Sequence, residues 1–159
     1  ILVLDQVTKK YMVSILPLCQ SGYCQAIELL PVFKLMVLHN RGAAFSFLDD
    51  AGGWQRWFLV FISSGVSLFI AGWLWRVQQS GQQRVLSLAL VFILGGALGN
   101  LVDRSVQGYV VDFLVFHYDV YYFPAFNIAD SAISIGAGLL ILDMFMSRQM
   151  GEVVSSKET

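Results

Sequence analysis

Long apolar runs separated by short polar segments set the pattern of this chain. Residues 57–75 and 85–102 contain no charged side chain, and a third apolar run covers about 127–146. A helix needs about 20 apolar residues to cross the hydrocarbon core of a membrane. The opening residues 1–16 are mostly apolar, and we expect them to be the distal part of a span whose beginning is missing. The pattern therefore predicts four transmembrane helices.

The composition agrees with a membrane protein. Of the 159 residues, 57% are apolar and 13% are charged, and the mean hydropathy is +0.66. Soluble domains carry about 25% charged residues. The length suits a single membrane domain that covers residues 1–159. A net charge of −1 gives no basic surface, so nucleic acid is not an expected partner.

The short connection between the second and third helices fixes the topology. Residues 76–84 leave room only for an antiparallel hairpin. The long segments 17–55 and 105–126 then lie on one face of the membrane, and the last residues, 148–159, form a tail on the other face. The Lys and Arg residues near the span ends are divided between both faces, so their distribution does not decide the orientation.

The two long segments differ in character. V-F-K-L-M-V-L-H, residues 32–39, is strand-like, so segment 17–55 is expected to form a small β-ribbon or sheet at the membrane surface. Segment 105–126 is rich in aromatic residues, which favour the membrane–water boundary, and a short interfacial helix or loop is expected there. The predicted fold class is therefore an all-α membrane protein with four transmembrane helices and these two additions.

Cys19 and Cys24 are the only cysteines in the sequence. They are too few for a zinc site, which normally has four ligands. They would form a small disulfide if their segment faces an oxidising compartment. Two free thiols are an equally good interpretation of the sequence.

Asp112 and Asp130 are the most informative polar residues, because both stand among apolar neighbours. An acid at membrane depth is costly and is by default a functional candidate. Each also has a simpler explanation: Asp112 as a solvated surface acid, and Asp130 as an acid in the first turn of a helix capped by Asn127. If the two acids meet, they would share a proton, because both cannot ionise cheaply. One could then take a proton from water while the other polarises a carbonyl.

Other polar residues gather on the same membrane face as the two acids. Asn100 and Asp103 lie on one helical face at i, i+3, and the i, i+4 spacing of Asp5 and Lys9 suits a salt bridge. Arg104 has two interpretations. It forms a surface ion pair with Asp103, or it is a functional cation that holds a backbone carbonyl or a lipid head group.

No other catalytic motif competes with the two acids. The sequence contains no H-E-x-x-H, no G-x-S-x-G, no Walker loop and no dinucleotide fingerprint. Gly95 and Gly99 form G-x-x-x-G, which by itself is a weak indication of close helix packing. A pair of carboxylates that needs no metal or cofactor is the chemistry that remains.

Five short blocks of residues follow one another in an order typical of a known family. They are L-D-Q-V-T-K at 4–9, N-R-G-A-A-F at 40–45, G-N-L-V-D-R at 99–104, V-V-D-F at 110–113 and F-N-I-A-D-S at 126–131. Each block is weak alone, but together they span nearly the whole chain. The chain therefore resembles the lipoprotein signal peptidases (signal peptidase II), aspartyl peptidases of the bacterial inner membrane. One departure is Arg41, which stands where that family commonly has Thr.

The resemblance implies an endopeptidase that removes the signal peptide from diacylglyceryl-modified prolipoproteins, just before the lipidated cysteine. It implies that Asp112 and Asp130 are the catalytic pair and activate water without a metal or cofactor. It implies substrate-binding roles for Asn40, Gly42, Asn100, Arg104 and Asn127. It implies supporting roles for Asp5, Lys9, Asp103 and Ala129.

The resemblance also implies an orientation and a set of partners. Segments 17–55 and 105–126 would be periplasmic, the active site would lie at that face of the inner membrane, and the tail 148–159 would be cytoplasmic. The expected partners are prolipoproteins, membrane lipids and globomycin, a cyclic peptide inhibitor of that family.

Two other classes of protein are compatible with parts of the pattern. A small proton-coupled transporter would also carry intramembrane acids, but it predicts acids through the membrane depth or an internal repeat. A structural membrane subunit would need no paired acids. The acids in this chain cluster at one face and no repeat is visible, which favours the peptidase.

Overall fold

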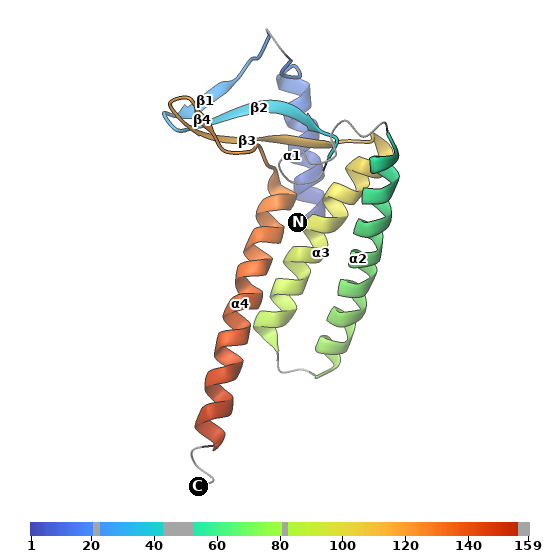
Figure 1. Cartoon of the computed structure of the whole chain (residues 1–159), viewed down its shortest axis with the longest axis vertical. Coiled ribbons are helices and arrows are strands. Elements are labelled where there is room, and N and C mark those ends of the chain that lie inside the picture. Colours follow the sequence, from blue (N-terminus) through green and yellow to red (C-terminus); the bar gives the residue numbers. More distant parts are fainter. Residues whose placement is uncertain (21–22, 43–52, 81–82, 156–159) are drawn as a thin grey trace.

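The computed structural model describes residues 1–20, 23–42, 53–80 and 83–155. Within these residues there are four helices, of which α2, α3 and α4 run side by side, while α1 lies at the end of the bundle that carries a small sheet (Figure 1). The helices are α1 (Leu2–Ile15), α2 (Trp54–Ser80), α3 (Arg84–Val106) and α4 (Ile128–Ser155).

Three of the described helices are long and apolar enough to cross a membrane, as the hydropathy pattern predicted. Their spans are Trp54–Gln79, Arg84–Val106 and Ile128–Ser147. The described part of α1 covers 14 residues and carries buried Asp5 and Lys9, so its role as a fourth span stays a prediction. α4 continues to Ser155, so most of the predicted tail 148–159 extends this helix.

A four-stranded sheet lies across one end of the helices (Figure 1). The strand order is β1-β2-β3-β4, and all neighbouring strands are antiparallel. The strands are β1 (Ile27–Leu30), β2 (Phe33–Asn40), β3 (Val110–Tyr118) and β4 (Tyr121–Tyr122). The small sheet predicted for segment 17–55 is therefore confirmed by β1 and β2.

The expectation of a short helix or loop in segment 105–126 is wrong, because β3 and β4 occupy half of it. β3 pairs with β2 so that His39 faces Val111 and Leu38 faces Asp112. The pairing satisfies the backbone N–H and C=O groups of a largely apolar, buried segment. The partner strand lies far away in the sequence, so no local pattern could reveal the pairing.

An apolar cluster joins the sheet to α1. Its buried members are Met12, Leu16, Val37, Val111 and Phe113. A disulfide links Cys19 to Cys24, shortly after the end of α1. The backbone N–H of Cys19 donates a hydrogen bond to the Val37 carbonyl of β2 at 2.9 Å. Of the two interpretations of the cysteines, the structure shows the disulfide. These contacts fix α1 against β2, which ends at Asn40.

Glycines allow α3 and α4 to approach closely. At Gly96, a Cβ atom would overlap the backbone oxygen of Ala129, and at Gly136 it would lie 2.7 Å from the backbone oxygen of Ala89. Small residues at such crossings let two helix backbones come together in a membrane. The start of α4 is therefore pressed against the end of α3 that carries the polar residues.

The glycines of the G-x-x-x-G pattern face α1 instead. A Cβ atom at Gly95 would lie 2.9 Å from the Cβ of Ile1, and one at Gly99 would lie 2.6 Å from Oδ2 of Asp5. The pattern thus indicated close packing correctly, but of α3 against α1. Gly99 leaves the space in which the Asp5 carboxylate lies.

Candidate active site

Asp112 and Asp130 come from different elements and meet around one asparagine. Asp112 lies in β3, and Asp130 lies in the first turn of α4. The side-chain amide of Asn127 donates to Oδ1 of Asp112 at 2.6 Å. The backbone N–H of Asn127 donates to Oδ2 of Asp130 at 3.2 Å. The two acids are therefore brought to one place, with Asn127 between them.

The start of α4 explains why Asp130 lies there. Oδ1 of Asn127 accepts a hydrogen bond from the backbone N–H of Asp130 at 3.0 Å, while the Asp130 carboxylate accepts from the Asn127 backbone. This reciprocal arrangement is a capping box. The predicted cap at Asn127 is confirmed, and the same contacts fix the Asp130 side chain at the site. Capping and a place beside Asp112 are thus not alternatives for Asp130.

Two further asparagines donate to the remaining carboxylate oxygens. The Asn40 amide donates to Oδ2 of Asp112 at 3.1 Å, and the Asn100 amide donates to Oδ1 of Asp130 at 2.8 Å. All four carboxylate oxygens therefore accept a hydrogen bond from an asparagine. Neutral amide donors hold both side chains in place without placing a cation in direct contact with them.

Asp112 is buried, with only 3% of its surface exposed, so its interpretation as a solvated acid is wrong. Burial and, to a smaller extent, the negative charge of Asp130 together raise the pKa of Asp112 to about 7, although hydrogen bonds from Asn40 and Asn127 and the charge of Lys9 oppose the shift. Asp112 is therefore a group that changes its protonation near neutral pH. A carboxyl group of this kind is suited to acid–base chemistry.

Arg104 holds a backbone carbonyl, which is one of its two predicted roles. Its Nη2 atom donates to the carbonyl oxygen of Gly42 at 3.1 Å. The backbone N–H of Gly42 in turn donates to Oδ1 of Asn40 at 3.1 Å. Asp103 pairs with Lys9 rather than with Arg104. The predicted site residues Asn40, Gly42 and Arg104 are thus joined beside Asp112, while residues 43–45 of the same block lie outside the described residues.

Lys9 is the centre of a buried charged network below the two acids. Its Nζ atom lies 2.8 Å from Asp5 and 2.9 Å from Asp103, and it donates to Oδ1 of Asn100 at 2.9 Å. Asp5, Lys9 and Asp103 are each no more than 3% exposed. The predicted salt bridge within α1 is confirmed, and α3 supplies the second acid.

The two acids of this network hold the backbone next to the candidate catalytic pair. Oδ1 of Asp5 accepts a hydrogen bond from the backbone N–H of Ala129 at 2.9 Å. Oδ2 of Asp103 accepts from the backbone N–H of Val111 at 3.3 Å. Ala129 and Val111 are the residues that immediately precede Asp130 and Asp112. The network therefore fixes each catalytic candidate through its preceding residue.

Two residues of this region had no predicted role. Gln6 donates to Oδ1 of Asp103 at 2.7 Å and so ties α1 to α3. Arg56 donates to the backbone carbonyls of Arg104 at 3.0 Å and Ser105 at 2.6 Å, at the end of α3. Gln6 lies inside the first sequence block, which was the available signal. Arg56 was visible only as a charge before an apolar run.

A cavity of about 840 Å³ opens beside the pair and contains Asp112, Asp130, Asn40 and Arg104 in its wall. Most of the remaining wall is apolar: Leu38, Phe123, Pro124, Phe126, Ile133 and Ile135. Among the described residues, no group of three or more His, Cys, Asp or Glu side chains is arranged to hold a metal ion. The cavity suits an apolar chain with a polar group at the two acids.

His39 also lines this cavity, and its ring stacks on Tyr109 with 3.7 Å between the ring centroids. Burial lowers the pKa of His39, and the charge of Arg41 lowers it further. The imidazole is therefore neutral at neutral pH, and it adds no positive charge beside Asp112.

The sequence matches one protein family over most of its length. Residues 1–146 match the family described as signal peptidase (SPase) II. A lipoprotein signal peptidase from Shewanella pealeana is 53% identical over 143 residues, which are 90% of this chain and 80% of the relative. Proteins of the same name from Alteromonas mediterranea and Pseudomonas paraeruginosa are 54% and 47% identical, over 90% and 96% of this chain and 75% and 87% of the relatives.

Two solved structures have a similar overall fold. A bacterial membrane enzyme determined by the in meso method at 2.3 Å resolution is similar with a TM-score of 0.73 and 29% identity, and the match covers 92% of this chain and 84% of that one. A second such structure at 1.9 Å resolution gives a TM-score of 0.72 and 28% identity, over 90% and 86% of the two chains.

Proposed function

Because the chain belongs to the signal peptidase II family, we propose that it removes the signal peptide from diacylglyceryl-modified prolipoproteins, just before the lipidated cysteine. Water activated between Asp112 and Asp130 would be the nucleophile. The observation that carries this mechanism is the hydrogen bonding of Asn127 to both carboxylates. An acid pair held by one residue can work as a unit.

The surroundings of the two acids support different roles for them. Asp112, with its raised pKa, carries the shared proton near neutral pH. Asp130 lies in the first turn of α4, where the helix dipole favours a carboxylate. Asp130 takes a proton from the water as its oxygen bonds to the scissile carbonyl carbon, and Asp112 donates its proton to the carbonyl oxygen. When the C–N bond then breaks, the proton on Asp130 passes to the leaving amine and Asp112 recovers its own.

The substrate backbone would be positioned by Arg104 and the asparagines. The Nε atom of Arg104 is buried and has no hydrogen-bond partner among the described residues, although Nη2 is engaged with Gly42. A buried donor without a partner is costly, and a substrate carbonyl would satisfy it. The apolar residues Ile133 and Ile135 of α4 would contact the signal segment, while the acyl chains stay in the lipid.

We place the sheet and the acid pair at the periplasmic face of the bacterial inner membrane, and the C-terminal end of α4 in the cytoplasm. The disulfide between Cys19 and Cys24 supports this orientation, because disulfides persist in oxidising compartments such as the periplasm. The exposed side chains of Tyr121 and Tyr122 support a position at the membrane boundary. In this orientation, segments 17–55 and 105–126 are periplasmic.

The mechanism can be tested by cleavage of a diacylated prolipoprotein with the purified protein in detergent. Asp112→Asn and Asp130→Asn should each lower turnover at least about 100-fold, because each removes an acid–base group. Asp119→Asn, the same change at an exposed turn of the sheet, is the matched control and should cleave like the unchanged protein. Robust cleavage by both site variants would end the proposal.

Two further conditions separate the peptidase from a small proton-coupled transporter. Only a peptidase shortens the prolipoprotein, and by this mechanism it does so in the presence of a metal chelator. Globomycin should block the cleavage. A protein that leaves the substrate intact but carries protons across liposome membranes would support the transporter instead.

A further inference from the structure

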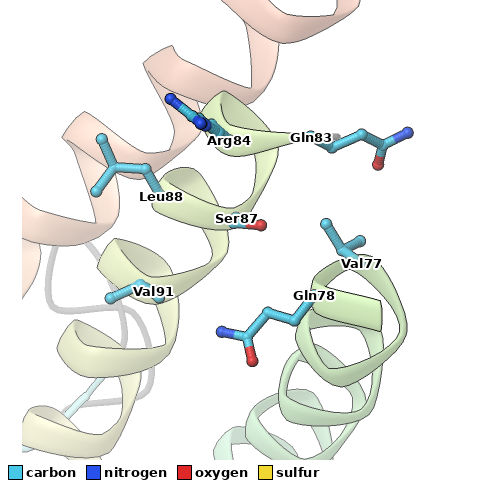
Figure 2. A pocket seen from close by; sticks show the side chains of 7 residues that line it. All are labelled: Val77, Gln78, Gln83, Arg84, Ser87, Leu88 and Val91. Atoms are coloured by element: carbon cyan, nitrogen blue, oxygen red, sulfur yellow. The ribbon is translucent and has the colours of Figure 1, made fainter. Parts of the chain in front are cut away.

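A second cavity lies between α2 and α3 (Figure 2), at the ends of these helices that lie opposite the sheet (Figure 1). It has a volume of about 380 Å³, and its wall includes Val77 and Gln78 from α2 and Arg84, Leu88 and Val91 from α3. We propose that this groove is a binding site for an anionic phospholipid, with the phosphate at Arg84 and an acyl chain along Leu88 and Val91. The proposal is independent of the peptidase mechanism.

The groove is polar near the helix ends and apolar deeper in the bundle. Arg84, Leu88 and Val91 follow one another at i, i+4 and i+7, so they lie along one face of α3. At a rise of 1.5 Å per residue, this row is about 10 Å long. In Figure 2, the side chains of Gln78 and Ser87 point into the space between the two helices, while those of Arg84 and Leu88 extend from the side of α3 that is turned away from α2. A cation at Arg84, followed by the apolar side chains of Leu88 and Val91, matches a ligand with an anionic head and an apolar chain.

The position of the groove in the membrane favours a lipid over a soluble ligand. Arg84 is the first residue of the span Arg84–Val106, and Gln78 lies at the end of the span Trp54–Gln79. Leu88 and Val91 therefore lie within the span, and 49% and 42% of their surfaces are exposed. In a membrane, this surface meets acyl chains, and the end of the groove meets head groups.

The charge of the groove favours an anionic head group. Its wall contains Arg84 and no acidic residue, and among the described residues Arg84 has no ion-pair partner. A zwitterionic lipid would bring its ammonium group close to this cation without an acid to receive it. Basic pockets between transmembrane helices at a membrane surface are suited to anionic head groups.

The experiment measures lipid binding to the full chain in detergent by native mass spectrometry. The probes are phosphatidylglycerol and phosphatidylethanolamine at equal concentration, and the measured quantity is the ratio of the two singly bound adducts. The unchanged protein should favour phosphatidylglycerol. Arg84→Gln, which removes the cation, and Ser87→Leu, which fills the groove but keeps the cation, should each lower this ratio at least about fivefold.

Arg76→Gln is the matched control, because it removes an arginine charge near the C-terminal end of α2, at the same end of the bundle as Arg84 but outside this groove. It should change the ratio less than twofold. Equal losses in Arg84→Gln and Arg76→Gln, or an unchanged ratio in Ser87→Leu, would show unspecific attraction and overturn the proposal. Displacement of phosphatidylglycerol by excess inorganic phosphate would identify a site for free anions and would also overturn it. Unchanged prolipoprotein cleavage in detergent verifies the folding of each variant.

Discussion

Replacement of Lys9 tests whether the buried charged network holds the proposed catalytic pair, Asp112 and Asp130. Lys9→Met keeps an unbranched side chain of similar length but removes the cation between Asp5 and Asp103. Both acids are almost completely buried, at 0% and 1% exposure. They would be left as two uncompensated carboxylates close to each other.

Removal of one partner from a buried ion pair costs about 3–5 kcal/mol of stability. Lys9 has two acidic partners, which argues for the upper end of this range. Asp5 and Asp103 would still accept hydrogen bonds from Ala129 and Val111, which argues against a larger loss. Proteins have a total stability of only about 5–15 kcal/mol. Lys9→Met should therefore unfold at a much lower temperature than the unchanged protein.

Lys10→Met is the matched control, because Lys10 is the neighbouring lysine and is exposed. Thermal unfolding in detergent, followed by circular dichroism, should separate the two variants clearly. Addition of Asp103→Asn to Lys9→Met removes one uncompensated charge and should restore part of the stability. The reasoning is refuted if Lys9→Met has the same melting temperature as Lys10→Met, or if the double variant is no more stable than Lys9→Met alone.

The same variants should show whether the Lys9 network positions Asp112 and Asp130 in addition to stabilising the fold. At a temperature where Lys9→Met is folded, loss of the anchors on Val111 and Ala129 should shift the two proposed catalytic acids. A misplacement of about 1 Å costs about 100-fold in rate. We expect the loss mainly in kcat, and we expect the stabilised double variant to remain slow. Recovery of kcat together with stability would show that the network has only a structural role.

Three other predictions follow from the contacts of the site. Cleavage should slow as the pH rises above about 7, because Asp112 then loses the proton that it donates, and a rate profile that stays flat well above neutrality would contradict this role. The raised pKa of Asp112 makes the folded protein bind more protons than the unfolded chain between about pH 4 and pH 7, so the free-energy cost of burying this side chain grows with pH in that window. From acidic to neutral pH, the free energy of unfolding of Asp112→Asn should therefore rise by up to about 4 kcal/mol relative to that of the unchanged protein, and its relative melting temperature should rise with it. A constant difference between the two proteins would refute the linkage. Arg56→Gln should cost about 1–2 kcal/mol, because the carbonyls of Arg104 and Ser105 at the end of α3 lose their side-chain donor, and thermal unfolding beside Arg76→Gln measures the difference.

The features that the sequence could predict are those encoded by local patterns. Hydropathy identified the three spans, and the strand-like character of residues 32–39 identified β2. The cap at Asn127 was visible because an asparagine followed three residues later by an acid is itself a helix-start signal. Each of these depends on residues within one or two turns of each other.

The features that the sequence could not predict depend on contacts between distant segments. An apolar run such as the one around Asp112 is ambiguous between helix and strand until its partner is known, and that partner is β2. The i, i+4 spacing of Asp5 and Lys9 indicated a local salt bridge, but it gave no sign that Asp103 of α3 completes the network. The bridging position of Asn127 likewise depends on where β3 meets α4.

The site separates charge compensation from chemistry. Lys9 is engaged with Asp5 and Asp103, and Arg104 with a backbone carbonyl, so among the described residues neither Asp112 nor Asp130 has an ion-pair partner. A cation in direct contact with Asp112 would favour its carboxylate form and lower its pKa. Neutral asparagine donors orient the same oxygens with a weaker effect, so burial dominates and the pKa stays near 7. The charged network can therefore stabilise the fold around the pair while the pair keeps a proton that it can transfer.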